Sequence, residues 1–204
     1  MATKYYAVKE GRCKGIFMTW AECQKQVTGF PGAVFKSFLT LEEAKQFLEG
    51  GQQSSATDFE ALLAEEGTLI AYVDGSFNNV TGAFSYGMVL LDGQEEHTSF
   101  QAFADPELAA MRNVAGEIKG AEAAMRYAVE HHYSRLYIFH DYEGIAKWCQ
   151  GIWKTNKEGT KAYKAYYDSI CDKLKVHFVK VAAHTGEHYN EMADSLAKEA
   201  LGLK

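Results

Sequence analysis

Four acidic residues occur in sequence contexts that could gather them into one site. Asp74 and Asp141 each follow a short apolar run that is typical of a buried strand, and Glu117 and Asp194 lie in stretches with helical spacing. Carboxylates about 4 Å apart repel by several kcal/mol per pair even at an effective dielectric constant of about 20, so only protons or bound cations would make such a cluster tolerable. Oxygen ligands favour hard ions such as Mg²⁺ or Mn²⁺.

From these residues alone, a metal site and ordinary surface charge both stay open as interpretations, because 27 of the 204 residues are acidic. No set of Cys and His residues with zinc-ligand spacing competes for a metal role. The four cysteines form no C-x-x-C pair, so we expect reduced thiols with structural roles. They are Cys13, Cys23, Cys149 and Cys171.

Length and composition predict one large domain or a large and a small one, since the chain is 47% hydrophobic with only two prolines. No apolar run approaches the roughly 20 residues that cross a membrane, and the N-terminal residues lack a signal-peptide core. We therefore expect a soluble, cytoplasmic protein with no membrane partner.

The net charge of −6 is unevenly distributed along the chain. Residues 1–50 carry seven Lys or Arg and five Asp or Glu, whereas the remaining residues carry 14 and 22. A weakly basic N-terminal part beside an acidic body suggests that one part binds a polyanion and the other concentrates metal ligands.

The uncharged segment GGQQSSAT, residues 50–57, is typical of a flexible linker. We accordingly predict a small domain over residues 1–49, a linker over 50–66 and a second domain over 67–204. The first is expected to be a ββαβα unit, and helices packed on one face of its sheet would leave the other face, or the loops, free to bind. Its predicted strands are 5–9, 15–19 and 33–38, and its predicted helices are 21–27 and 41–48.

The second domain is predicted to be an α/β fold with the element order βββαβααβα. A three-stranded antiparallel meander followed by parallel additions makes the first and fourth strands neighbours, which places Asp74 and Asp141 at one edge of a mixed five-stranded sheet. The expected strands are 69–76, 84–91, 95–103, 136–140 and 176–181. The expected helices are 113–131, 143–153, 161–174 and 189–201.

The motifs of this second domain resemble type 1 ribonuclease H. They are Asp74-Gly-Ser, Asn113 with Glu117 on the following helix, Asp141 after a strand, and HTGEHYNEMAD from His184 to Asp194. The resemblance runs through residues 68–202 and keeps the order of every motif. It implies a ribonuclease H-like sheet flanked by helices and endonucleolytic hydrolysis of the RNA strand of an RNA/DNA hybrid, giving 5′-phosphomonoesters.

The resemblance also implies roles for individual residues. Asp74, Glu117, Asp141 and Asp194 would bind two Mg²⁺ ions, for which Mn²⁺ could substitute. His184 would assist water activation or product release, and Asn113 would read the RNA minor groove. We expect a monomer that uses no small-molecule cofactor.

Residues 1–49 resemble the hybrid-binding, or viroplasmin-like, domain of the same family. The motifs are YYAVKEGR (5–12), GIFMTW (15–20) and FKSF (35–38). The resemblance implies that Tyr6, Trp20, Phe35 and Lys36 bind the duplex, with aromatic rings on sugars and the lysine on a phosphate. The competing interpretation is that the three aromatic residues form the core of the small domain.

Two departures from the family pattern concern the DNA strand. A basic helix-and-loop handle found in some members is missing after the second catalytic strand, although Trp148, Trp153, Lys154 and Lys157 could line a DNA-phosphate surface. Arg112 replaces a small polar residue of the family's phosphate pocket. Two other classes stay open: a non-catalytic hybrid-binding protein on this fold, and another nuclease or strand-transfer enzyme that shares the fold.

Overall fold

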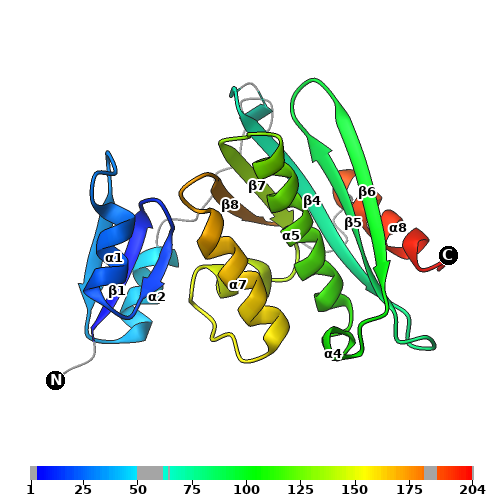
Figure 1. Cartoon of the computed structure of the whole chain (residues 1–204), viewed down its shortest axis with the longest axis horizontal. Helices are drawn as coiled ribbons and strands as arrows, with labels where there is room; N and C mark the ends of the chain where they lie inside the picture. Colours follow the sequence, from blue (N-terminus) through cyan, green and yellow to red (C-terminus); the bar gives the residue numbers. More distant parts are fainter. Residues whose placement is uncertain (1–3, 50–61, 64, 182–187, 204) are drawn as a thin grey trace.

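Two β-sheets, each with its own helices, make up the computed structural model of the chain, which describes residues 4–49, 62–63, 65–181 and 188–203. The small N-terminal sheet and the larger sheet lie side by side, with helix α7 (Glu158–Ile170) between them (Figure 1). Of the predicted linker, residues 50–61 and 64 lie outside the described part of the chain.

The N-terminal sheet has the strand order β2-β1-β3, with antiparallel pairing on both sides of β1. Its strands are β1 (Tyr5–Glu10), β2 (Gly15–Phe17) and β3 (Val34–Phe38), and its helices are α1 (Trp20–Val27) and α2 (Leu41–Glu49). Helix α1 starts at a capping box in which Thr19 and Glu22 each bond the other's backbone N–H. The ββαβα order predicted from the sequence is therefore confirmed.

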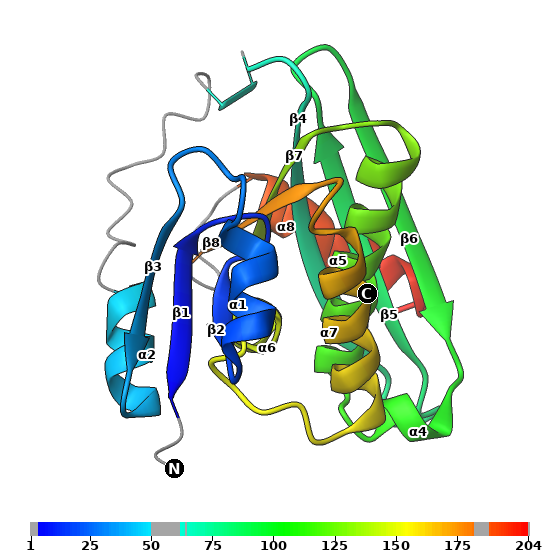
Figure 2. The same cartoon turned by 60° about the vertical axis from the view of Figure 1, so that its left-hand side comes forward.

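The two helices of this domain cover opposite faces of its sheet, so the expectation of helices on one face is wrong (Figure 2). Neighbouring residues of a strand point to opposite faces, and β1 is apolar on both. Ala7 packs with Ala44 of α2, whereas Val8 packs with Cys23 and Val27 of α1. A free surface must therefore lie beside the helices rather than on a whole open face.

The larger sheet has the order β6-β5-β4-β7-β8, as the resemblance implies. Strands β4, β5 and β6 form the antiparallel meander, and β7 and β8 are added in parallel on the other side of β4. Asp74 and Asp141 therefore lie at the same edge of two neighbouring strands. The strands are β4 (Thr68–Phe77), β5 (Phe84–Leu91), β6 (Glu96–Phe103), β7 (Arg135–His140) and β8 (Lys175–Lys180).

Helices pack on both faces of this sheet (Figure 1). The larger core cluster joins one face to α5, α6 and α7, and a smaller cluster joins the other face to α8. The remaining helices are α4 (Pro106–Ala109), α5 (Asn113–Glu130), α6 (Gly144–Cys149) and α8 (His188–Ala200). No helix in the described part of the chain is long and apolar enough to span a membrane.

Helix α6 ends at Cys149, four residues before the predicted end. Gly151 has a φ of 71°, a left-handed backbone that ends the helix and turns the chain toward the N-terminal domain. The Gln150 carbonyl accepts a hydrogen bond from the Ile16 N–H at 2.9 Å, and Ile152 is buried with Ala7 of the N-terminal core. The segment expected to complete a helix instead forms part of the interface between the two domains.

The expectation of four reduced thiols is wrong for two of them. Cys13 and Cys171 form a disulfide, with Cα atoms 5.2 Å apart and 158 residues between them along the chain. Cys23 and Cys149 are free and buried. Sequence spacing cannot reveal this pair, because it forms only when the N-terminal domain docks against the end of α7.

Two glycines bring α5 against β4 and β5. A Cβ atom on Gly116 would lie 1.9 Å from the Ser85 carbonyl oxygen, and one on Gly75 would lie 2.2 Å from the Asn113 carbonyl oxygen. No side chain fits in either place, so helix and sheet approach more closely than larger residues would allow. This approach carries Glu117, the residue after Gly116, toward Asp74, the residue before Gly75.

We predict that Gly116→Ala destabilises the protein by about 1–3 kcal/mol, because the new methyl group meets backbone atoms that cannot rotate away. Gly120→Ala on the same helix is the matched control. Its Cβ would lie 3.1 Å from the Tyr86 Cβ, and the gain in helix propensity of up to about 1 kcal/mol offsets this contact. Urea unfolding of both variants checks the prediction, and equal stabilities would contradict it.

Candidate active site

Three of the four expected carboxylates meet where β7 ends beside the central strand β4. Oxygen atoms of Asp74 on β4, Glu117 on α5 and Asp141 after β7 all lie within 4.8 Å of one another. The Gly75 N–H donates a hydrogen bond of 2.7 Å to Asp74 Oδ1 and fixes that carboxylate. Three elements that are distant in sequence therefore supply one oxygen-only cluster.

Burial and neighbouring charges make two of these groups, Asp74 and Glu117, hard to ionise. Burial is the largest cause that raises the pKa of Asp74 to about 7, and the charges of Asp141 and Asp194 raise it further. Burial also raises the pKa of Glu117 to about 9, again helped by Asp141 and Asp74. In the metal-free protein, the cluster therefore holds protons at neutral pH that isolated carboxyl groups would release.

One oxygen of the cluster lacks a hydrogen-bond partner. Glu117 is 1% exposed, and its Oε2 atom has no partner among the described residues. A buried polar atom without a partner is costly and indicates a missing ligand or ion. Oxygen donors alone, held at this spacing, fit hard divalent cations such as Mg²⁺ or Mn²⁺.

The fourth expected carboxylate, Asp194, lies beside this cluster and not within it. Helix α8 approaches β5 closely at Gly87, where an added Cβ would lie 2.0 Å from the Ala193 carbonyl oxygen. Asp194 accepts a hydrogen bond of 2.6 Å from Lys198 one turn further along the helix. Its charge nevertheless contributes to the raised pKa of Asp74, so it belongs to the same electrostatic site.

The other two residues expected near the site have different outcomes. His184 falls within residues 182–187, outside the described part of the chain. Asn113 is exposed at the N-terminus of α5, one turn before Glu117. It also lines a pocket whose other lining residues include Tyr142, the residue after Asp141.

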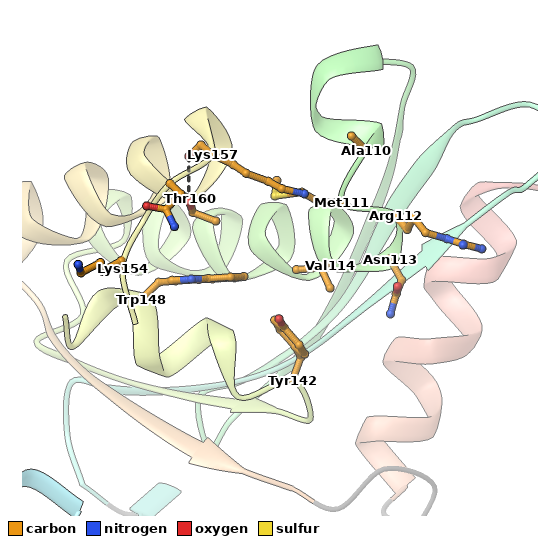
Figure 3. A pocket seen from close by; sticks show the side chains of 11 residues that line it. Ala110, Met111, Arg112, Asn113, Val114, Tyr142, Trp148, Lys154, Lys157 and Thr160 are labelled. Carbon is orange, nitrogen blue, oxygen red and sulfur yellow. Dashed lines mark hydrogen bonds between the residues drawn. The ribbon is translucent and has the colours of Figure 1, made fainter. Parts of the chain in front are cut away.

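This pocket has a volume of ≈ 500 Å³ and opens between the start of α5 and the segment that joins α6 to α7 (Figure 3). Trp148 and Tyr142 lie next to each other in its lining, and the exposed Lys154 and Lys157 line it as well. The rings of Trp148 and Tyr142 are 5.6 Å apart. The pocket therefore combines aromatic surface with cations, which suits the sugar and phosphate groups of a nucleic acid strand.

Tyr142 and the backbone of Arg112 are features of the pocket that the sequence did not reveal. Arg112 has φ 56° and ψ −133°, a conformation that is costly for a residue with a side chain. Its guanidinium group points away from the pocket, donates to Asn79 Oδ1 at 2.6 Å and lies over the Phe77 ring (Figure 3). The arginine thus connects the start of α5 to the turn after β4.

A second candidate surface lies on the N-terminal domain. The ring of Trp20 lies 5.8 Å from that of Tyr6 and 5.9 Å from that of Phe35. Trp20 is 44% exposed and Phe35 is 42% exposed, so these two residues are not core. Lys36 is exposed on the same edge strand, with its ammonium group over the Phe38 ring. The half-buried Tyr6 therefore forms one ring cluster with Trp20 and Phe35, whereas Lys36, paired with Ala7, points to the opposite face of the sheet.

Comparisons with known proteins agree with both domains. A family model described as RNase H matches residues 66–202, and one described as Ribonuclease H1 N-terminal domain matches residues 4–48. Human Ribonuclease H1 is 28% identical over 255 residues, covering 96% of this chain and 88% of the human protein. A Ribonuclease H of Wolbachia pipientis is 30% identical over 145 residues, covering 65% of this chain and 94% of that protein.

A further match covers only a small part of a longer relative. A Ribonuclease H of Crithidia fasciculata is 52% identical over 48 residues, which is 24% of this chain and 10% of that protein. Among solved structures, RNase H1 of Halobacterium salinarum has a TM-score of 0.53 at 24% identity and covers 66% of this chain and 98% of its own. An N-terminal RNase H domain from Mycobacterium tuberculosis has a TM-score of 0.55 at 19% identity, covering 66% and 94%. These structural matches support the fold of the larger domain.

We predict that the metal-free protein loses stability as pH rises from about 7 to about 9. Glu117 and Asp74 have folded pKa values of about 9 and 7, well above the roughly 4 of unfolded carboxyl groups, so the folded state holds protons that the unfolded state has released. Each rise in pH therefore favours the unfolded state, and the loss of stability continues until the folded carboxyl groups have ionised too. Burial lowers the pKa of His140 and His177 to about 4, so these residues are neutral in both states across this window.

Unfolding by urea in the presence of a chelator checks this prediction. Glu117→Gln should flatten the decrease, because the amide cannot ionise. Added Mg²⁺ should restore stability most strongly at the high-pH end, where the carboxylates are ionised. A wild-type protein whose stability stays level across the window, or matches that of Glu117→Gln at each pH, would contradict the raised pKa values.

Proposed function

The chain belongs to the ribonuclease H family, and we propose that it hydrolyses the RNA strand of RNA/DNA hybrids endonucleolytically with the aid of two divalent cations. The observation that supports this most directly is the buried cluster of Asp74, Glu117 and Asp141, in which one glutamate oxygen has no partner. Such a site is electrostatically unfavourable by itself and becomes favourable when cations bind. Mg²⁺ is the proposed ion, with Mn²⁺ as a substitute.

Two bound cations would neutralise the charge that develops on the phosphate and lower the pKa of the attacking water. The chain's part is to hold the ligands in place. Asp74 on the central strand, Glu117 on α5 and Asp141 after β7 would hold the ions. Asp194 would complete the set once its hydrogen bond with Lys198 is exchanged for a cation.

We propose that His184 assists water activation or product release, as the resemblance implies. A histidine suits this role because its protonation changes near neutral pH. Cleavage leaves a phosphate on the 5′ side of the downstream product in this scheme. The products are therefore 5′-phosphomonoesters.

Selection of the RNA strand requires a contact that distinguishes a 2′-hydroxyl group from hydrogen. Asn113 is the proposed reader, since its amide can both donate and accept a hydrogen bond and it is exposed one turn before Glu117. The DNA strand would follow the neighbouring pocket, where Lys154 and Lys157 can meet phosphates, whereas Trp148 is buried in the core at 9% exposure. This division places RNA at the carboxylates and DNA at the lysines.

The N-terminal domain is proposed to supply much of the affinity for the hybrid. The acidic body around the carboxylates has little to attract a polyanion, whereas residues 1–50 carry an excess of basic residues. We propose the domain limits 1–49 and 67–204, with the intervening residues as the connection. The exposed ring cluster of Tyr6, Trp20 and Phe35 is the proposed contact surface.

Two other functions account less well for these observations. A non-catalytic hybrid-binding protein would have no need for three clustered carboxylates, two of which, Asp74 and Glu117, have raised pKa values. Another nuclease or strand-transfer enzyme of this fold could use the same cluster, but it would leave the exposed aromatic surface of the N-terminal domain without a role. Cleavage assays on hybrid, double-stranded RNA and double-stranded DNA separate these possibilities.

We predict that Asp74→Asn lowers the rate of hybrid cleavage by about 10²-fold or more, because both positioning and charge neutralisation depend on this carboxylate. The variant should stay folded and still bind the hybrid, since the substitution removes a repulsive charge. Glu130→Gln, at the exposed far end of α5, is the control that removes an acidic charge outside the site. Substantial cleavage by Asp74→Asn in saturating Mg²⁺ would exclude the proposed site.

We predict that Trp20→Ala in the full-length protein weakens binding of a long hybrid by about 1–3 kcal/mol, the range for base–aromatic stacking, with little change in stability. Lys36→Ala should also weaken binding and should reduce the slope of log affinity against log salt concentration by about one. Lys45→Ala on α2, which removes a lysine paired with Glu42, is the control. A Trp20→Ala protein with unchanged affinity would exclude this surface as the contact.

A further inference from the structure

The two domains meet at an interface that a covalent bond crosses. Cys13 lies in the turn between β1 and β2, and Cys171 lies just after α7. Both side chains are buried, 4% and 9% exposed. The bond therefore joins the loop of one domain directly to the end of a helix in the other.

The non-covalent contacts across this interface, within the described residues, are modest. One backbone hydrogen bond joins Ile16 to Gln150, and Ile152 inserts into the N-terminal core. The ion pairs Arg12–Asp172 at 3.5 Å and Glu10–Lys175 at 3.4 Å are partly exposed to solvent. Exposed ion pairs contribute little, and domains joined by small polar interfaces usually move relative to one another.

A small redox reagent can approach this bond from solvent. A cleft of ≈ 370 Å³ opens between α1 and α7 and is lined by Cys13 itself, together with Phe17, Lys25 and Lys164. The two free cysteines differ in this respect. Cys23 and Cys149 are fully enclosed, and burial raises the pKa of both thiols, which keeps them unreactive.

We propose that Cys13 and Cys171 form a reversible interdomain disulfide that fixes the N-terminal domain in its docked position when oxidised and releases it when reduced. The oxidant is a low-molecular-weight disulfide of the glutathione class. One cysteine thiolate attacks a sulfur of that disulfide and expels one small thiol; the second cysteine then attacks the mixed disulfide and expels the other. Two protein thiols lose two electrons and two protons, and one small disulfide becomes two thiols.

The docked arrangement leaves both candidate binding surfaces open. Trp20 and Phe35 keep more than two fifths of their surface exposed, and the pocket beside the carboxylates stays accessible. The oxidised protein therefore presents two binding surfaces at one fixed spacing. A fixed spacing avoids the entropy lost when a loosely joined domain is ordered on a long substrate. This consequence rests on the proposed hybrid-cleaving function, whereas the redox chemistry does not.

The chemistry is tested on the folded full-length protein without substrate. The protein is equilibrated in buffers of varied reduced-to-oxidised glutathione ratio, alkylated, and mapped by mass spectrometry. We expect the Cys13–Cys171 peptide pair to form and disappear in one reversible transition while Cys23 and Cys149 stay reduced. A pair that stays reduced at every ratio, that opens only on unfolding, or that involves Cys23 or Cys149 would overturn the proposal.

The functional consequence is tested by Michaelis constants on a long hybrid and on one too short to reach the N-terminal domain. Oxidation should lower the constant for the long hybrid by about 3- to 10-fold and leave the short one unchanged. The double variant Cys13→Ser/Cys171→Ser, shown to be folded by its melting curve, should behave as the reduced protein in both states. Cys23→Ala should respond to oxidation as the wild type does.

Equal Michaelis constants for the oxidised and the reduced wild type on the long hybrid, or a higher constant after oxidation, would overturn the claim that the docked form binds the hybrid more tightly. A protein that cleaves no hybrid in either state would instead refute the proposed function. The mass-spectrometric result would stand in that case, so the two failures are distinguishable.

Discussion

Repulsion between buried carboxylates is the constraint on which the catalytic half of this molecule depends. Asp74, Glu117 and Asp141 come from three elements and would separate if the backbone allowed it. The close packing of Gly75 against the start of α5 and of Gly116 against β5 prevents this, because neither position leaves room for adjustment. Holding the carboxylates together therefore costs stability, and the site becomes favourable only when protons or cations are bound.

The same constraint explains the arrangement around the cluster. Burial raises the pKa of Glu117 and Asp74 more than neighbouring charges do, so excluding water strengthens both the repulsion and the attraction for a cation. Lys198 neutralises Asp194 at the edge of the site. Cations for a nucleic acid backbone lie further out, at Lys154 and Lys157 and on the N-terminal domain, where they do not compensate the carboxylates directly.

Much of the fold could be predicted from the sequence because its signals are local. Apolar runs that end at Asp74 and Asp141 predicted two strands, and the order of the elements predicted that these strands are parallel neighbours, as they are in the structure. The motifs around Glu117 and Asp194 placed both residues on helices that reach the same edge of the sheet. The sequence pattern of the small domain left open whether Trp20 and Phe35 lie on the surface or in the core. Their exposure in the structure shows that both lie on the surface.

The features that could not be predicted depend on contacts between distant segments. Cys13 and Cys171 are 158 residues apart, and only docking of the two domains brings them together. Helix α6 ends early because Gly151 turns the chain into that same interface. Arg112 combines a positive φ with a side-chain hydrogen bond to Asn79, 33 residues earlier in the chain, and no local sequence pattern predicts either feature. His184 and the exact domain limits stay predictions.

The measurement that tests the central claim most directly is the number of protons released when a divalent cation binds. Titration calorimetry of Mn²⁺ into the full-length protein near pH 7, repeated in buffers of different ionisation enthalpy, gives this number. The account predicts net release of about one proton or more, because Glu117 holds its proton up to a pH of about 9 and a bound cation displaces it. A binding heat that is the same in every buffer, or the absence of binding, would contradict it.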